Sequence, residues 1–166
     1  MGSASSAHAL LLHAVALLAL IEIAHWVGDF LLQTDYMALN KSKSWRALGI
    51  HTTVVAVVLC GAVGGWAAWH AWVDTFPVAL FVGVNWAAHF VTDAVTSRVN
   101  AKLWFVKPVL AGQGWRDIGG GVTRTQNTFY LDPAGNRHWF FVSIGADQMV
   151  HRITLLVTAY WFLLDV

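Results

Sequence analysis

Charged residues are scarce in this chain. Asp, Glu, Lys and Arg make up 11% of its 166 residues, whereas they make up about 25% of a typical soluble domain. The formal net charge is only +1, so the composition does not indicate a nucleic-acid partner. More than half of the residues are hydrophobic (57%), including ten Trp and nine Phe. We therefore expect residues 1–166 to form a single integral-membrane domain rather than a soluble enzyme.

Cysteine is almost absent, since Cys60 is the only one. An intrachain disulfide is therefore excluded. Cys60 lies within an apolar run, so we expect it to pack as a small buried hydrophobe.

Long apolar runs, in contrast, are abundant. Four of them are long enough to cross the hydrocarbon core of a bilayer, which is about 30 Å thick. The sequence therefore predicts an all-α, integral-membrane four-helix bundle with one long connection at about 98–138. The predicted spans are about 8–33, 47–69, 76–97 and 139–164.

Lysine and arginine are unevenly distributed among the connections. Lys41, Lys43 and Arg46 lie between the first two spans, and six more basic residues lie in 98–138, but the connection between the second and third spans has none. Loops rich in Lys and Arg stay in the cytoplasm. We therefore expect both termini outside and the first and third connections in the cytoplasm.

The first and third spans share a short motif. His25-Trp26-Val27-Gly28-Asp29 and His89-Phe90-Val91-Thr92-Asp93 both read His, aromatic, Val, any residue, Asp. Each of these spans is followed by a helix with a histidine in its inner half, His51 or His151. The pattern suggests two duplicated helical hairpins, related by an axis along the membrane normal, with the site at their interface.

Three of the predicted spans carry a His and an Asp four residues apart. That spacing is close to one helical turn, so each pair projects from one face of its helix. An ionisable residue inside a membrane span is a functional-site candidate. The candidate metal ligands are His25, Asp29, His89, Asp93, Asp147 and His151.

These residues are also predicted to lie at one depth. His25 is eight residues before the inner end of its span, or roughly 12 Å at the rise of an α-helix. His89 is about as far from the inner end of the third span, and His51 and Asp147 are within about two turns of the inner starts of theirs. We therefore expect one polar layer in the cytoplasmic half of the bundle.

The chemistry of this layer suits a divalent metal. Imidazole and carboxylate ligands bind zinc, manganese or iron, and the layer has enough of them for one or two ions. His51 would be a further ligand or a general base, and Arg98 and Arg152 would hold a phosphate group. Residues expected to orient the ligands through hydrogen bonds are Glu22, Gln33, Asn85 and Gln148.

Three stretches of the sequence resemble a known family. The segment 25–35, HWVGDFLLQTD, resembles the opening motif of a family of small bacterial and phage integral-membrane proteins catalogued as a domain of unknown function. Segments 85–104 and 138–151 are similar to further motifs of that family. The resemblance implies a multi-span helical protein of the bacterial inner membrane and supplies no activity. In pattern only, the His and Asp pairs are also similar to those of membrane-bound metal-dependent hydrolases and of cation-diffusion-facilitator zinc transporters.

Three functions are compatible with these observations. The first is a membrane-embedded metal-dependent hydrolase that takes an amphipathic substrate, such as a phosphate-bearing lipid, from the cytoplasmic leaflet. The second is a transporter of divalent metal or protons, which the apolar outer halves of the spans disfavour. The third is a non-catalytic adaptor in which the polar layer is an interhelical brace. Membrane lipid is the expected partner. Because four spans can enclose only a small site, a homodimer is an alternative to a monomer.

Overall fold

The structure is a computed structural model that describes residues 2–72, 74–104 and 137–164. These residues are predominantly helical and include no strand, so the predicted all-α class is confirmed for them. The elements are the α-helices α1 (Gly2–Trp26), α2 (Asp35–Asn40), α3 (Trp45–Trp69), α4 (Phe76–Trp104) and α5 (Arg137–Ala159), and the π-helices η1 (Val27–Leu31) and η2 (Tyr160–Leu164).

Within the described part of the chain, three helical stretches are long and apolar enough to cross a membrane. They are 6–31, 45–69 and 76–101, and each is 25 or 26 residues long. The fourth predicted span corresponds to α5 and η2, which do not meet the same criterion. The polar side chains of α5, among them Asp147, Gln148 and Arg152, lower its hydropathy.

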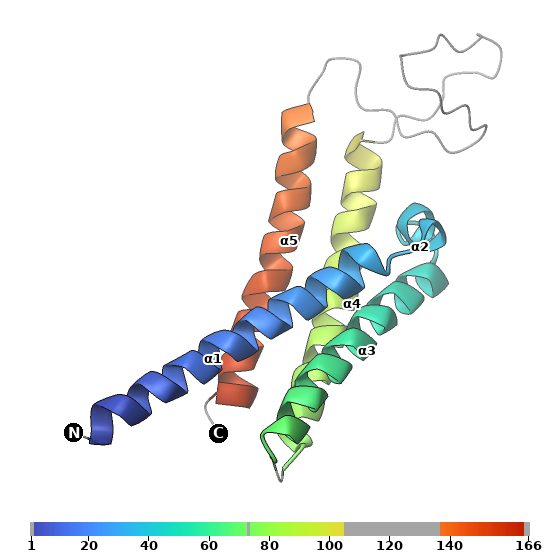
Figure 1. Ribbon diagram of the computed structural model, residues 1–166. Coiled ribbons are helices and arrows are strands. Elements are labelled where there is room, and N and C mark those ends of the chain that lie inside the picture. Colours follow the sequence, from blue (N-terminus) through green and yellow to red (C-terminus); the bar gives the residue numbers. More distant parts are fainter. Residues whose placement is uncertain (1, 73, 105–136, 165–166) are drawn as a thin grey trace, which may run out of the picture.

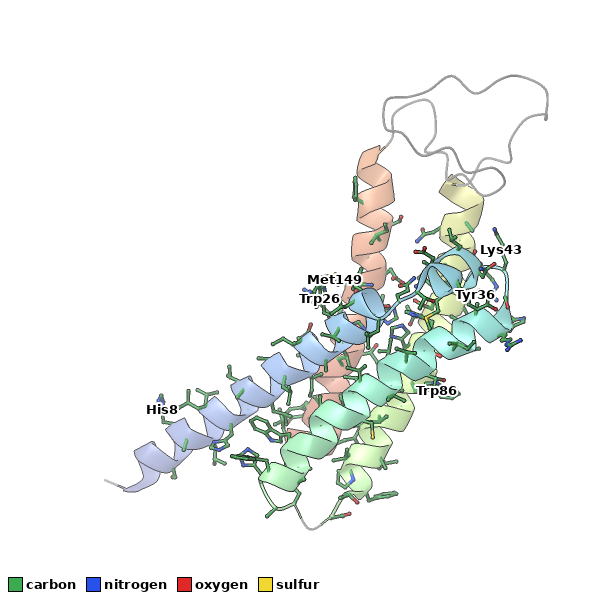
Figure 2. The ribbon with its side chains drawn as sticks, turned by 45° about the vertical axis from the view of Figure 1, so that its right-hand side comes forward. His8, Trp26, Tyr36, Lys43, Trp86 and Met149 are labelled. Atoms are coloured by element: carbon green, nitrogen blue, oxygen red, sulfur yellow. The ribbon has the colours of Figure 1, made fainter. Side chains whose placement is uncertain are left out.

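The long helices alternate in direction (Figure 1). Helix α4 lies between α3 and α5, and α1 crosses the group obliquely and contacts both α3 and α5. The start of α1, the turn between α3 and α4 and the end of η2 lie at one end of the molecule. Helix α2, Tyr36 and Lys43 lie at the opposite end (Figure 2). We call the latter the α2 end.

The interior is apolar toward one end and polar toward the α2 end. Helix α4 illustrates the change, because Phe81 is buried among apolar side chains and Asn85, His89 and Asp93 follow at four-residue steps on the same buried face. Helix α3 runs the other way, from His51 and Thr52 through Val55 to a wholly apolar stretch. The two antiparallel helices therefore bring their polar segments together.

Many large apolar side chains face outward from the helices. Leu10, Leu11 and Ile23 of α1, for example, are each more than half exposed. Cys60 is also exposed, so the expectation that it would be buried is wrong, because its face of α3 points away from the other helices. A continuous apolar exterior of this kind is typical of a surface that contacts lipid or another protein.

Some predicted boundaries differ from the observed ones. The first span does not continue as a regular helix to Gln33, because η1 ends it at Leu31 and Gln33 lies in the turn that follows. Helix α4 continues beyond the predicted end at residue 97 to Trp104, since nothing between these residues breaks a helix. Most of the predicted connection at 98–138 lies outside the described residues.

Gly28 allows η1 to approach α3 closely. A Cβ atom at this position would lie 2.8 Å from Cα of Val55, which is far inside normal contact distance. Because Gly28 has no side chain, η1 packs closely against α3 at this point. The neighbouring residue Asp29 therefore lies near α3.

Candidate metal centre

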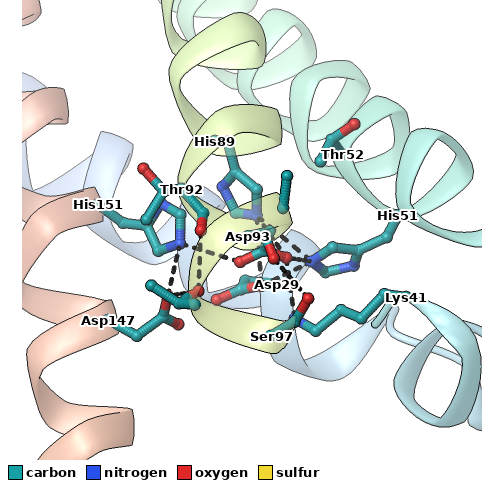
Figure 3. Close-up of polar contacts among 12 residues, drawn as sticks. Asp29, Lys41, His51, Thr52, His89, Thr92, Asp93, Ser97, Asp147 and His151 are labelled. Carbon is teal, nitrogen blue, oxygen red and sulfur yellow. Dashed lines mark hydrogen bonds and ion pairs between the residues drawn. The ribbon is translucent and has the colours of Figure 1, made fainter. Parts of the chain in front are cut away.

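Seven ionisable side chains from five helical elements meet near the α2 end. His51 and Asp93 are almost fully buried, with 0% and 1% of their surface exposed, and most of the others are buried as well. Asp147 is half-buried. The cluster, partly shown in Figure 3, consists of His25 of α1, Asp29 of η1, His51 of α3, His89 and Asp93 of α4, and Asp147 and His151 of α5.

Two imidazole nitrogens and two carboxylate oxygens lie close together in this cluster. Nε2 of His51 lies 3.0 Å from Oδ1 of Asp29 and 3.2 Å from Oδ2 of Asp93. Nε2 of His89 lies 3.3 Å from that of His51 and 3.7 Å from each of the same two oxygens. Ligand atoms around a tetrahedral zinc ion, at bonds of about 2.0–2.1 Å, are about 3.3–3.4 Å apart. The ligand atoms of Asp29, His51 and His89 all lie within 4.8 Å of one another, so this group could hold a divalent ion, with Oδ2 of Asp93 beside His51.

Hydrogen bonds among the side chains alone would satisfy the same four atoms poorly. A neutral imidazole has at most one N–H to donate. Nε2 of His51 nevertheless faces Asp29, Asp93 and Nε2 of His89 at once. One N–H of His51 therefore cannot satisfy all three of these neighbours. A cation accepts such an arrangement more readily than one shared proton does.

A second group of donors lies on the other side of Asp93. Its Oδ1 is 3.3 Å from Nε2 of His151, which is 3.6 Å from Oδ1 of Asp147. Thr96 donates a hydrogen bond of 2.6 Å to Oδ1 of Asp147. The ligand atoms of Asp93, Asp147 and His151 all lie within 4.8 Å of one another, so this group could also hold a metal ion.

His25 completes a third group with two other histidines. Its ring centroid lies 5.4 Å from that of His89 and 5.5 Å from that of His151, and one ring nitrogen of each of the three lies within 4.8 Å of the others. Nε2 of His25 is buried and has no hydrogen-bond partner among the described residues. A buried imidazole nitrogen without a partner is costly, and a bound ion would satisfy it.

Lys41 contributes the cation of the cluster, a role that sequence analysis did not assign to it. Its Nζ lies 2.9 Å from Oδ2 of Asp93, and Figure 3 shows its side chain reaching in from the right of the view. Helix α2 positions it: Thr34 caps the start of this helix and buried Met37 anchors it. The feature of the sequence that could have identified Lys41 is its position directly after α2, a short helix with an N-terminal cap.

The formal charge of the cluster favours a divalent cation. Asp29, Asp93 and Asp147 supply three negative charges, and among the described residues of the cluster Lys41 supplies one positive charge. With neutral imidazoles the balance is −2. Buried charge of one sign is strongly unfavourable, and a single divalent ion would neutralise it.

Gln148 links the two halves of the cluster. Its Nε2 donates to Oδ2 of Asp29 at 2.9 Å and to Oδ2 of Asp147 at 3.4 Å. The Oδ1 atoms of both carboxylates are thereby left facing the histidines. This geometry is the one expected of a residue that orients metal ligands.

The other predicted residues make different contacts. The guanidinium of Arg98 lies 3.9 Å above the ring of Trp45 and donates to the carbonyl of Ala94. Nε of Arg152 lies 3.4 Å from Glu22 on an exposed face. The proposed phosphate contacts of both arginines stay predictions.

Asn85 lies one turn deeper than the cluster and joins α4 to α5. It donates to Oγ1 of Thr158 at 2.7 Å and to the carbonyl of Phe81 at 2.8 Å. Gln33, in the turn after η1, no longer shares a helix face with Asp29. Asn85 thus lies on the same face as His89 and Asp93, as the helical repeat predicts, whereas Gln33 does not share the face of Asp29.

The fold and this cluster together define an all-helical protein with membrane-length helices and a buried group of His and Asp residues able to hold a metal ion. Comparison with family models gives the affiliation directly. The chain belongs to the family described as "Protein of unknown function (DUF3307)", whose model matches residues 16–165. No curated protein and no solved structure matches the chain.

Proposed function

We propose that this chain is an integral membrane protein that binds a divalent metal ion and hydrolyses a phosphate ester of an amphipathic substrate. Helix α1 with η1, α3, α4, and α5 with η2 would cross the bilayer as a four-helix bundle. Supporting this, large apolar side chains face outward along these helices, and three of the helical stretches have the length and composition of spans.

The observation that carries the proposal is the group of imidazole and carboxylate donor atoms around His51 and His89. Asp29, Asp93 and the two histidines come from three different helical segments, and each carboxylate oxygen lies 3.0 to 3.7 Å from both imidazole nitrogens. An interhelical brace needs pairs of donors and acceptors, and does not need each carboxylate oxygen to face two imidazole nitrogens. The coordination set, imidazole with carboxylate, fits zinc, manganese or iron.

Hydrolysis is favoured over transport because the polar residues do not continue through the molecule. Toward the end opposite α2, the core between the helices is filled by buried apolar side chains such as Leu17, Leu59 and Phe81. A transport path needs polar groups across the whole membrane. The cluster therefore fits a site that is entered and left from the α2 end.

Basic residues support a cytoplasmic location for that end. Lys41, Lys43 and Arg46 all lie near α2, and such residues are retained on the cytoplasmic side. A lipid with a phosphate headgroup in the inner leaflet could place that headgroup at the cluster. The ammonium of Lys41, next to Asp93, would then attract the phosphate.

The bound ion would polarise the phosphoryl group and activate a water molecule. In the reaction, the water oxygen bonds to phosphorus and the bond from phosphorus to the leaving oxygen breaks. A carboxylate or imidazole of the cluster takes the proton that the water loses, and a proton is returned to the leaving oxygen.

The proposal is tested with the protein purified into lipid nanodiscs. We expect metal-dependent release of phosphate from a phosphate-bearing lipid, lost in His89→Ala and retained in His70→Ala, a control at the opposite end. Metal-driven flux into sealed proteoliposomes, with no hydrolysis of any phosphate lipid offered, would replace the hydrolase with a transporter. A cell phenotype that survives His89→Ala would favour an adaptor.

A further inference from the structure

Asp93 stands between two groups of metal-binding side chains. Its Oδ2 faces His51 at 3.2 Å and His89 at 3.7 Å, whereas its Oδ1 faces His151 at 3.3 Å. In Figure 3 the carboxylate lies at the centre, with His51 and Lys41 on one side and His151 and Asp147 on the other. The two oxygens of one carboxylate therefore serve separate donor groups.

We propose that the cluster holds two divalent ions bridged by the carboxylate of Asp93. The first ion lies among Asp29, His51, His89 and Oδ2 of Asp93. The second lies among Oδ1 of Asp93, Asp147 and His151. This inference rests on the proposed function and specifies its metal centre.

The two positions differ in how many protein atoms surround them. The first has four protein donors, the number found in zinc sites that are closed to other ligands. The second has three, as in catalytic sites that keep one position for water or substrate. The second ion is thus the one that would meet the substrate, and it lies beside half-buried Asp147.

His25 gives independent support for a cation on the His151 side. It is 4% exposed, its Nε2 has no hydrogen-bond partner within the described residues, and one of its ring nitrogens lies within 4.8 Å of those of His89 and His151. A buried histidine so placed is suited to a position between the two ions or as a further ligand of the second.

Charge links the second ion to the substrate. One divalent ion brings the formal charge of the cluster from −2 to neutral, and a second leaves it at +2. A phosphate group with two negative charges would balance this excess. The dinuclear centre therefore matches the phosphate chemistry of the proposed reaction, in which paired ions about 3.5–4 Å apart stabilise the attacking and leaving oxygens.

The experiment measures manganese stoichiometry and magnetic coupling. Protein in nanodiscs is stripped with chelator, loaded with Mn²⁺, freed of excess ion and analysed by elemental analysis and electron paramagnetic resonance. We expect two Mn²⁺ per chain and an exchange-coupled spectrum. We expect Asp147→Asn to hold one Mn²⁺ with an uncoupled six-line signal, and Asp74→Asn, in the turn before α4, to behave as wild type.

The outcomes separate the inference from the function on which it rests. One uncoupled Mn²⁺ per wild-type chain would overturn the bridged pair while leaving a metal-dependent hydrolase intact. Two uncoupled ions, or an Asp147→Asn protein that still holds a coupled pair, would overturn the assignment to Asp93 and Asp147. No bound ion of any kind would remove the proposed metal centre altogether. The wild-type spectrum decides the matter even if the variant does not fold.

Discussion

Nε2 of His51 on α3 lies 3.2 Å from Oδ2 of Asp93 on α4, closer than the 3.7 Å that separates Asp93 from His89 on its own helix. The same holds on α5, where His151 is 3.3 Å from Asp93 but 3.6 Å from Asp147. The closest contacts of the cluster therefore form between helices. The site exists only when the helices are assembled, so its metal binding and the packing of the helices are linked.

Gln148→Leu is expected to weaken metal binding by about 10–100-fold, the usual effect of removing a residue that orients metal ligands. The amide of Gln148 holds Oδ2 of Asp29 at 2.9 Å, and leucine of similar size cannot donate this hydrogen bond. Competition with a fluorescent zinc chelator measures the change. Gln33→Leu, in the turn after η1, is the matched control, and equal affinities of both variants would contradict the role assigned to Gln148.

Asn85→Leu should separate stability from metal binding. The substitution removes the hydrogen bond of 2.7 Å to Thr158 but none of the seven cluster side chains. Interhelical hydrogen bonds in membranes contribute about 0.6–2 kcal/mol, so we expect a lower midpoint of thermal unfolding with metal content unchanged. A large loss of bound metal would show that Asn85 acts on the cluster after all.

Lys41→Met removes the ammonium that lies 2.9 Å from Asp93. The positive charge of Lys41 opposes a metal ion nearby and attracts an anionic substrate. The variant should therefore bind metal more tightly, by several-fold, and be inhibited less by inorganic phosphate. Lys43→Met, which alters an exposed lysine two residues further on, should change neither quantity. Weaker metal binding by the Lys41 variant would contradict this role.

Gly28→Ala is expected to destabilise the fold. The new Cβ would lie 2.8 Å from Cα of Val55, so η1 and α3 would have to move apart. Overpacking of this kind costs about 1–3 kcal/mol, and displacement of neighbouring Asp29 should lower metal affinity as well. Both effects can be followed by thermal unfolding and metal titration of the same sample.

Gly49→Ala provides the control for this change, because a Cβ there would meet nothing within 4 Å. Alanine is the better helix former, so this variant should be at least as stable as wild type. If the two alanine variants unfold at the same temperature, the close approach of η1 to α3 is not what Gly28 provides.

The helical fold and the members of the cluster were predictable from the sequence for simple physical reasons. Long apolar runs indicate helices, and a four-residue spacing places two polar side chains on one face. Because the helices alternate in direction, polar segments at matched depth, such as those around His51 and His89, must meet. In the structure His51 and His89 are both buried, as this matched depth predicts.

The features that sequence analysis missed depend on contacts between distant segments. The π-turn of η1 shifts Gln33 off the helix face, and it accompanies a close contact with Val55 that no local pattern reveals. Lys41 was interpreted only as a topology signal, because its reach to Asp93 depends on how α2 packs. The guanidinium of Arg98 lies over the ring of Trp45, a contact between separate helices that no local pattern reveals.

The central claim is that the buried cluster binds divalent metal, and elemental analysis tests it most directly. Protein purified without chelator, and again after loading with zinc, manganese or iron, is compared with His51→Ala and with His13→Ala, whose histidine is exposed on α1. We predict at least one tightly held ion per chain in wild type and His13→Ala, and a loss of at least tenfold in affinity for His51→Ala. Wild-type protein that retains none of the three metals, or a His51→Ala protein that retains as much as wild type, would contradict the account.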